Sequence, residues 1–124
     1  MKKITSLLLL FINLFAFAQT TTIPSPALAE GPVELRFNKA GTPLASYTGT
    51  IYAHIGLTVD GAQWQNVIGS WGNNSLQPAL TLVSGTTFKL NLGTSLYSYF
   101  GVPTTSTLTQ ICVVFRATSG TPQP

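Results

Sequence analysis

Residues 51–74 read IYAHIGLTVDGAQWQNVIGSWGNN, and this one stretch holds both tryptophans and the only histidine of a chain of 124 residues. Every second residue from Ile51 to Ile55 is apolar, whereas Tyr52 and His54 lie between them. This alternation is the period of a β-strand that buries one face and exposes the other. The stretch therefore predicts a strand whose polar face carries a phenol and an imidazole side chain.

A second strand is expected to follow after a tight turn. Asp60 and Gly61 form the turn, since glycine adopts positive φ without steric cost. If residues 63–71 then form a regular strand, Trp64 and Trp71 point to opposite faces, because side chains alternate along a strand. One indole would anchor the core, and the other would be free for a different role.

The rest of the chain is also rich in strand and turn signals. Residues 76–92 predict a hairpin that turns at Ser84 and Gly85, and Pro78 places its first strand at a sheet edge or delays its start. Residues 95–100 predict either one helical turn or an aromatic loop. The last strand is the most apolar and is expected at the centre of a sheet. Strands outside the central stretch are expected at residues 33–38, 76–83, 86–92 and 108–117.

Six strands with frequent turn signals and no long helix predict an all-β protein. The expected architecture is an antiparallel β-sandwich of immunoglobulin-like type. These strands would come after an N-terminal signal peptide that is cleaved off.

The N-terminus has the three parts of a secretory signal peptide. Lys2 and Lys3 give a positive start, residues 4–15 are apolar, and Ala16 and Ala18 form a small-x-small cleavage site. The apolar run is shorter than the about 20 residues that span a bilayer, which favours cleavage over anchoring. The protein is thus expected to be exported, secreted or held at the cell surface, with no membrane span in its mature form.

Composition divides the chain into a signal peptide at residues 1–18, a Thr/Pro-rich linker at 19–32, a β-sandwich module at 33–117 and a flexible tail at 118–124. Removal of the leader leaves 106 of 124 residues, the size of one domain. It also removes two of the six basic residues and lowers the formal net charge from +3 to +1. The remaining basic residues are scattered and form no cluster that could neutralise phosphates, which excludes nucleic-acid binding.

The chain offers little for catalysis or metal binding. Glycoside hydrolysis needs two facing carboxylates, but the acids are Glu30 in the linker, Glu34 on a strand and Asp60 in a turn. A triad would need His54 as its base, and no Gly-x-Ser-x-Gly motif accompanies it. One histidine and one cysteine give no transition-metal site, and Cys112 is expected to be a small buried hydrophobe. No catalytic residue, metal or cofactor is predicted, and the chain is not expected to be an enzyme.

What remains is a set of aromatic and amide side chains suited to sugar binding. A sugar ring has an apolar C–H face that stacks on an indole or phenol ring, and its hydroxyls take hydrogen bonds from amides and imidazole. Each side chain also has a structural alternative, because tryptophan in a small sandwich is often core and a lone histidine is often a hydrogen-bonded structural residue. The candidate ligand-binding residues are Trp64, Trp71, Tyr52, His54, Asn73 and Asn74.

Several motifs resemble a known kind of module. Tyr-x-His-x-Gly at 52–56, followed by Trp-x-x-Val-x-Gly-x-Trp-Gly at 64–72, resembles the small starch-binding-like β-sandwich modules that precede α-amylase-type glycosidases in secreted Bacteroidetes proteins. Segments 99–103 and 113–116 resemble the same modules, so the likeness covers roughly residues 31–120. The resemblance implies non-catalytic binding of an α-glucan, a starch-like polysaccharide, in support of a glycosidase partner or a fused catalytic domain.

Two other interpretations stay open. In one, the chain is a structural spacer or interaction sandwich whose aromatic residues are all core. In the other, it is the N-terminal piece of a larger secreted glycosidase. Exposure of Trp64 and Trp71 distinguishes ligand binding from the spacer, because a sugar platform must face solvent.

Export is tested by expressing the full chain with its own leader. We expect the secreted protein to begin at or near Gln19, because the cleavage site ends at Ala18. Mass spectrometry of the N-terminal peptide from the secreted fraction measures this. A secreted protein that retains Met1 would contradict the prediction.

Overall fold

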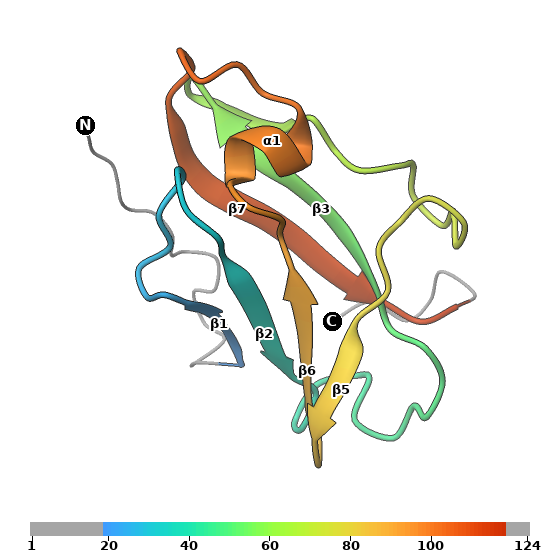
Figure 1. The fold of residues 1–124 in the computed structure, drawn as a ribbon. Coiled ribbons are helices and arrows are strands. Elements are labelled where there is room, and N and C mark those ends of the chain that lie inside the picture. The colour runs from blue at the N-terminus through green and yellow to red at the C-terminus, as the bar shows by residue number, and fades with distance from the viewer. Residues whose placement is uncertain (1–18, 119–124) are drawn as a thin grey trace.

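The computed structural model describes residues 19–118, which form two antiparallel sheets packed as a β-sandwich (Figure 1). One sheet has four strands in the order β1-β2-β6-β5, and the other has three in the order β4-β3-β7. The predicted all-β sandwich is confirmed, whereas the predicted signal peptide and residues 119–124 of the predicted tail lie outside the described residues. The elements are β1 (Thr20–Ile23), β2 (Glu34–Asn38), β3 (Tyr52–Val59), β4 (Ala62–Gln65), β5 (Thr81–Ser84), β6 (Thr87–Asn91), α1 (Leu96–Phe100) and β7 (Leu108–Arg116).

The inner faces of the two sheets meet in one apolar core. Phe37 of β2 and Phe115 of β7 stack across the layers, with ring centroids 4.0 Å apart and planes inclined by 19°. Leu35, Ile55 and Leu57 beside them have no exposed surface. Full burial of an aliphatic or aromatic side chain contributes about 1.5–3 kcal/mol. This shared core therefore holds the four-stranded sheet against the three-stranded one.

β3 is the central strand of the three-stranded sheet. It pairs with β7 from Tyr52↔Arg116 to Val59↔Leu108, and its other edge meets β4 and then Ala79. The prediction that the last strand is central is wrong, because β7 pairs only with β3 among the described strands. A strand is apolar where its faces are buried. Its faces can be buried even at the edge of a sheet, where the strand pairs with only one neighbour.

The cysteine of β7 lies on the outer face of the three-stranded sheet and is only partly covered there. Cys112 lies opposite Gly56 in the β3–β7 ladder, and its Sγ atom is 3.5 Å from the hydroxyl oxygen of Thr58. The prediction that Cys112 is a small buried hydrophobe is wrong in its burial, because the side chain points to the outer face and is half-buried there.

The segment predicted as a linker, residues 19–32, contains a strand. Residues 20–23 form β1, which pairs with β2 from Thr20↔Phe37 to Ile23↔Glu34. The reason is local, because threonine and isoleucine are branched at Cβ and favour the extended backbone of a strand. The four-stranded sheet thus begins before the position that composition predicts.

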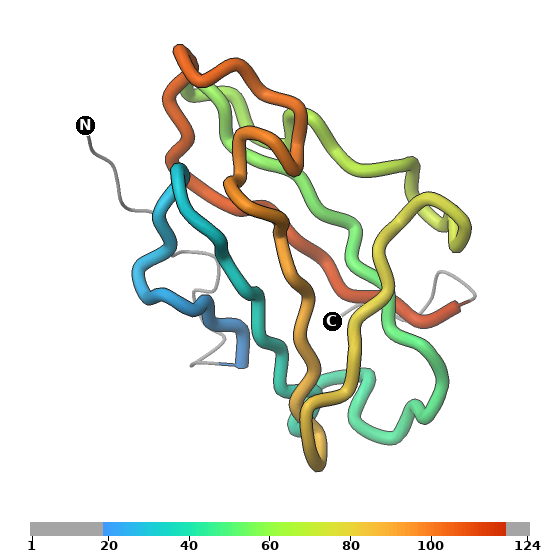
Figure 2. The backbone as a smooth tube through the Cα atoms, viewed as in Figure 1, coloured from blue at the N-terminus to red at the C-terminus, as the bar shows by residue number. Residues whose placement is uncertain are grey.

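The chain between β4 and β5 makes a long excursion along one side of the sandwich (Figure 2). It returns to β3 at residues 78–80, where the Ala53 amide donates to the Pro78 carbonyl (2.9 Å) and the Leu80 amide donates to the Ile51 carbonyl (2.8 Å). β5 then starts at Thr81 as an edge strand. Both effects expected of Pro78, a late start and an edge position, are confirmed.

The hairpin and the helical turn follow the sequence signals. β5 and β6 pair antiparallel across the predicted turn at Gly85. Ser95 caps α1 by accepting the Ser98 amide hydrogen (3.0 Å), and Gly101 ends the helix in the left-handed conformation at φ 71°. Of the two alternatives for residues 95–100, the helical turn is therefore correct. Within residues 19–118 no helix has the length and apolar character to cross a membrane.

The missing side chain of Gly56 allows the excursion to pass close to β3. A Cβ atom built at Gly56 would lie 2.9 Å from Cγ2 of Val67 and 3.0 Å from the carbonyl oxygen of Gln65. Real Cβ atoms do not approach other atoms so closely. The path of the chain after β4 therefore depends on glycine at this position.

Gly56→Ala is expected to lower the free energy of unfolding by about 1–3 kcal/mol, because the added methyl group must displace backbone as well as a side chain. Gly31→Ala is the matched control, since a Cβ atom there meets nothing within 4 Å. Urea denaturation of both variants measures the difference. Equal destabilisation by the two substitutions would contradict the close approach at Gly56.

Candidate functional site

Two residues with left-handed backbone stand at the end of β4 and at the start of the excursion between β4 and β5. Trp64 and Asn66 have φ angles of 56° and 54°, in the left-handed region. Asparagine tolerates this conformation, whereas a bulky residue adopts it at a cost of about 1–2 kcal/mol. β4 therefore ends at Gln65, and the regular strand predicted at residues 63–71 does not form.

Both tryptophans lie around one histidine. The ring centroids of Trp64 and Trp71 are 5.2 Å and 5.1 Å from that of His54. The prediction that the indoles point to opposite faces is wrong, because the positive φ angles of Trp64, Asn66 and Gly69 break the strand alternation. Neither indole is core, since Trp64 is 39% exposed and Trp71 is 46% exposed.

A chain of hydrogen bonds connects the histidine to a buried arginine. Nε of Arg116 donates to Oε1 of Gln77 (2.6 Å), and the amide nitrogen of Gln77 lies 2.6 Å from Nδ1 of His54. Because a guanidinium can only donate, the Gln77 oxygen faces Arg116 and its NH₂ group faces His54. Nδ1 of His54 is therefore the acceptor, and the proton of the neutral ring is on Nε2.

The Arg116 side chain is fully buried on the outer side of the three-stranded sheet. Its Nη1 donates to the Ala117 carbonyl (2.9 Å), and its Cζ lies 4.8 Å from the Tyr52 ring centroid and 5.9 Å from that of Trp71. Nη2 has no hydrogen-bond partner, and no carboxylate of the described residues pairs with this arginine. Aromatic faces thus replace the usual acidic partner of a buried cation.

The two asparagines expected to contact a ligand have other contacts. Oδ1 of Asn73 accepts the amide hydrogens of Ser75 (2.9 Å) and Leu76 (3.0 Å), which fixes the turn that follows Trp71. Nδ2 of Asn74 donates to the Thr118 carbonyl (2.8 Å). Both amides hold the excursion in place. The face around the histidine is made by Tyr52, His54, Trp64 and Trp71, and the buried side chains of Gln77 and Arg116 lie beneath it. The cluster therefore has six residues, four on the surface and two below it.

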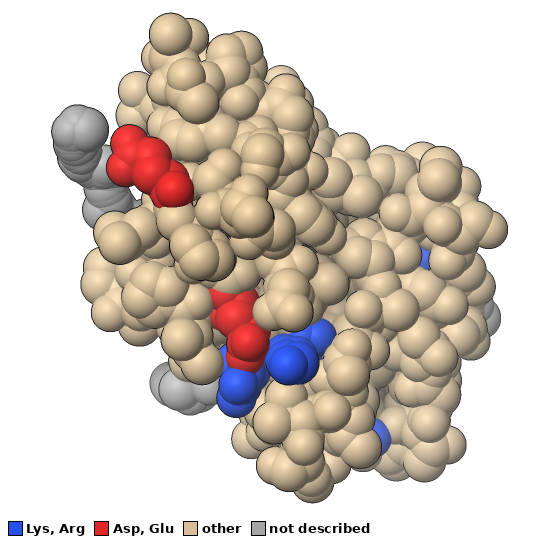
Figure 3. Space-filling view, in the orientation of Figure 1, with Lys and Arg blue, Asp and Glu red and all other residues tan. Residues whose placement is uncertain are grey.

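The chemistry of this face is that of a neutral binding surface. Within residues 19–118 no cluster of three or more His, Cys, Asp or Glu side chains could hold a metal ion. Asp60 accepts the Thr107 amide hydrogen (2.8 Å), and Glu34 pairs with Arg36. Figure 3 views the molecule from the side of the four-stranded sheet, opposite to this cluster, and there too charged side chains occupy only a small part of the surface. The groups available at the cluster are aromatic rings and hydrogen-bond donors.

Sequence reasoning finds four of these six residues and misses Arg116 and Gln77. Arg116 does leave a signal, because it is the only charged residue in an otherwise uncharged and mainly apolar strand. Gln77 leaves none. It lies 39 positions from Arg116, and only the return of the excursion to β3 brings the two together.

No protein-family model matches this chain, and no curated protein matches it. A functional assignment therefore depends on the residues of the cluster and their geometry.

The pKa of His54 is lowered below its ordinary 6.5 by burial and by the charge of Arg116. As the pH falls below 6.5, the unfolded chain binds a proton that the folded chain does not. The free energy of unfolding should therefore fall as the pH falls from 6.5 toward the folded pKa. Thermal unfolding midpoints between pH 7.5 and pH 5 measure this loss.

His54→Gln is the control for the pH series, because its amide oxygen can accept the hydrogen bond from Gln77 and has no proton to gain. Its unfolding midpoint should vary less over the same range. A variant that loses as much stability as the wild type below pH 6.5 would show that another group is responsible.

Proposed function

We propose that the face formed by Tyr52, His54, Trp64 and Trp71 binds a polysaccharide of the α-glucan class without cleaving it. The observation that carries this proposal is the pair of exposed indoles that both pack against one histidine. The resemblance of residues 52–72 to starch-binding-like modules agrees with it. In this role the protein is secreted and assists a glycosidase, which is a separate partner or a fused domain.

The chemistry of a sugar matches the groups on this face. The C–H face of a pyranose ring stacks on an indole ring, and such contacts contribute about 0.5–1.5 kcal/mol beyond the area they bury. The Nε2–H group of His54 and the indole N–H groups can donate to ring or hydroxyl oxygens. The left-handed backbone of Trp64 adds support, because strained residues concentrate at functional sites.

The inclination of the rings favours a curved glycan over a flat one. The planes of Trp64 and Trp71 make angles of 34° and 77° with the same imidazole, so the two indoles are inclined to each other by at least 43° (77° − 34°). Two rings so inclined cannot both stack on a flat ribbon such as a β-1,4-glucan. An α-linked chain turns from one sugar to the next and can meet both.

A non-catalytic role fits the positions of the acids. Asp60 is engaged with the backbone of Thr107, and Glu34 lies in the other sheet, paired with Arg36. Neither is among the residues of the aromatic face. The alternative of a structural spacer is favoured by buried aromatic residues, and the exposure of both indoles argues against it.

Calorimetry with soluble α-glucan oligosaccharides tests the proposal. We expect a Kd of about 0.01–1 mM, since one or two stacked rings and a few hydrogen bonds supply roughly −7 to −4 kcal/mol. Trp64→Ala and Trp71→Ala should each weaken binding by about tenfold, whereas Trp71→Phe keeps part of it. Because the ligand is neutral, the affinity should hardly change with salt.

Ile23→Ala is the matched control, because Ile23 is 51% exposed but lies on β1 in the other sheet. It should bind as the wild type does. Samples of the same mixtures should show no newly released reducing ends. The absence of heat at millimolar ligand would favour the spacer, and hydrolysis by the pure protein would overturn the non-catalytic role.

A further inference from the structure

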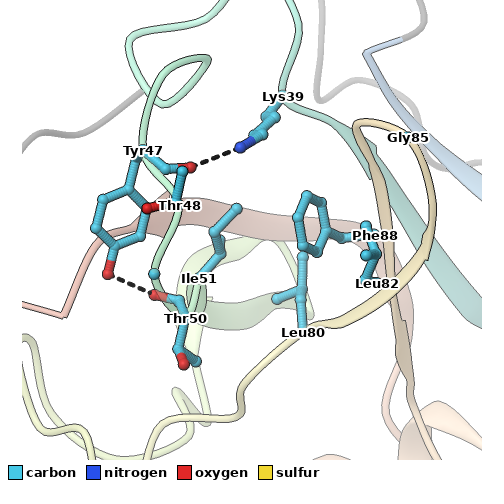
Figure 4. A pocket seen from close by; sticks show the side chains of 10 residues that line it. Lys39, Tyr47, Thr48, Thr50, Ile51, Leu80, Leu82, Gly85 and Phe88 are labelled. Carbon is cyan, nitrogen blue, oxygen red and sulfur yellow. Dashed lines mark hydrogen bonds between the residues drawn. The ribbon is translucent and has the colours of Figure 1, made fainter.

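A hollow of about 490 Å³ lies between the segment at residues 47–51 and the β5–β6 hairpin (Figure 4). Its volume falls in the range of about 300–1,000 Å³ that is typical of small-molecule sites. It shares no residue with the aromatic face around His54. The residues that line it are Lys39, Tyr47, Thr48, Gly49, Thr50, Ile51, Leu80, Leu82, Gly85 and Phe88.

One side of the hollow is apolar. Ile51 and Leu80 are buried side chains, and the Phe88 ring is half-buried next to them in Figure 4. Leu82, on the edge strand β5, completes this side and is 56% exposed. When another apolar group covers so exposed an apolar side chain, the free energy falls, because apolar surface is removed from water.

The opposite side is polar and rigid. The Tyr47 hydroxyl donates to the Thr50 carbonyl (3.0 Å) and so closes the short segment on itself. Lys39 reaches this segment from the end of β2. Its ammonium donates to the Tyr47 carbonyl at 2.5 Å and lies 5.8 Å from the centroid of the Phe88 ring. The positive charge is therefore held at the boundary between the polar and apolar sides.

No carboxylate neutralises this ammonium within the described chain. Among residues 19–118 the only ion pair joins Arg36 to Glu34. An ammonium has three donors, and the one fixed bond at Lys39 goes to the Tyr47 carbonyl. The hollow thus combines a positioned cation with an uncovered apolar wall.

We propose that this hollow binds a small amphipathic organic anion, a carboxylate attached to an aromatic or aliphatic body. The carboxylate pairs with the ammonium of Lys39, and the body lies along Phe88, Leu80 and Leu82. The two parts of the ligand match the two sides of the hollow in charge and polarity. This site is independent of glycan binding at the aromatic face.

The proposal is tested with 4-phenylbutyrate and its neutral analogue 4-phenylbutanamide, titrated into the ¹⁵N-labelled full chain at pH 7. The acid should shift the amide signals of Gly49 and Gly85 and bind more tightly than the amide by about fivefold, the preference expected of one partly exposed ion pair. Added salt should reduce this preference. This comparison uses only the wild-type protein, so it does not depend on the folding of any variant.

Lys39→Gln should remove the preference for the acid, whereas Lys89→Gln should keep it. Lys89 is the matched control because it is adjacent to Phe88 on β6 but does not line the hollow. Equal affinity for the two ligands, or signal shifts confined to the indole N–H groups, would overturn the proposal. Loss of the preference in both lysine variants would do the same, since it would indicate attraction by net charge alone.

Discussion

The structure depends on one buried cation that has no acidic partner in the described chain. Removing a guanidinium from water costs several kcal/mol, and Arg116 recovers this through the amide of Gln77, the Ala117 carbonyl and the π faces of Tyr52 and Trp71. These partners come from β3, from the end of β7 and from the excursion between β4 and β5. β3 and β7 are already joined by their ladder, so the side chain chiefly fastens the excursion to these two strands.

The buried charge of Arg116 also determines the hydrogen bonding of the binding face. Gln77 uses its oxygen for Arg116 and can only offer its NH₂ group to His54, so the tautomer of the histidine follows from the charge of the arginine. Burial and the closeness of that charge together lower the pKa of the imidazole. Trp71 covers Arg116 with one part of its ring system and leaves the rest in water. Stability and the candidate site thus share residues.

The sequence predicts the parts that depend on local rules. The alternation from Ile51 to Ile55, the hairpin at Gly85 and the delay imposed by Pro78 each follow from side-chain period or backbone freedom. The arrangement of the two indoles does not, because it requires Trp64 in a conformation that tryptophan rarely adopts. The role of Gln77 is equally hidden. Its two partners lie 23 and 39 positions away, and no local pattern indicates such a contact.

The placement of both tryptophans around one histidine gives the protein a built-in optical reporter. The chain contains only these two indoles, and both lie within about 5 Å of the same imidazole. Its tryptophan fluorescence therefore arises from one small area of the surface and not from an average over the fold. Emission will respond to solvent polarity and to quenching at that face, while the opposite sheet contributes nothing to the tryptophan signal.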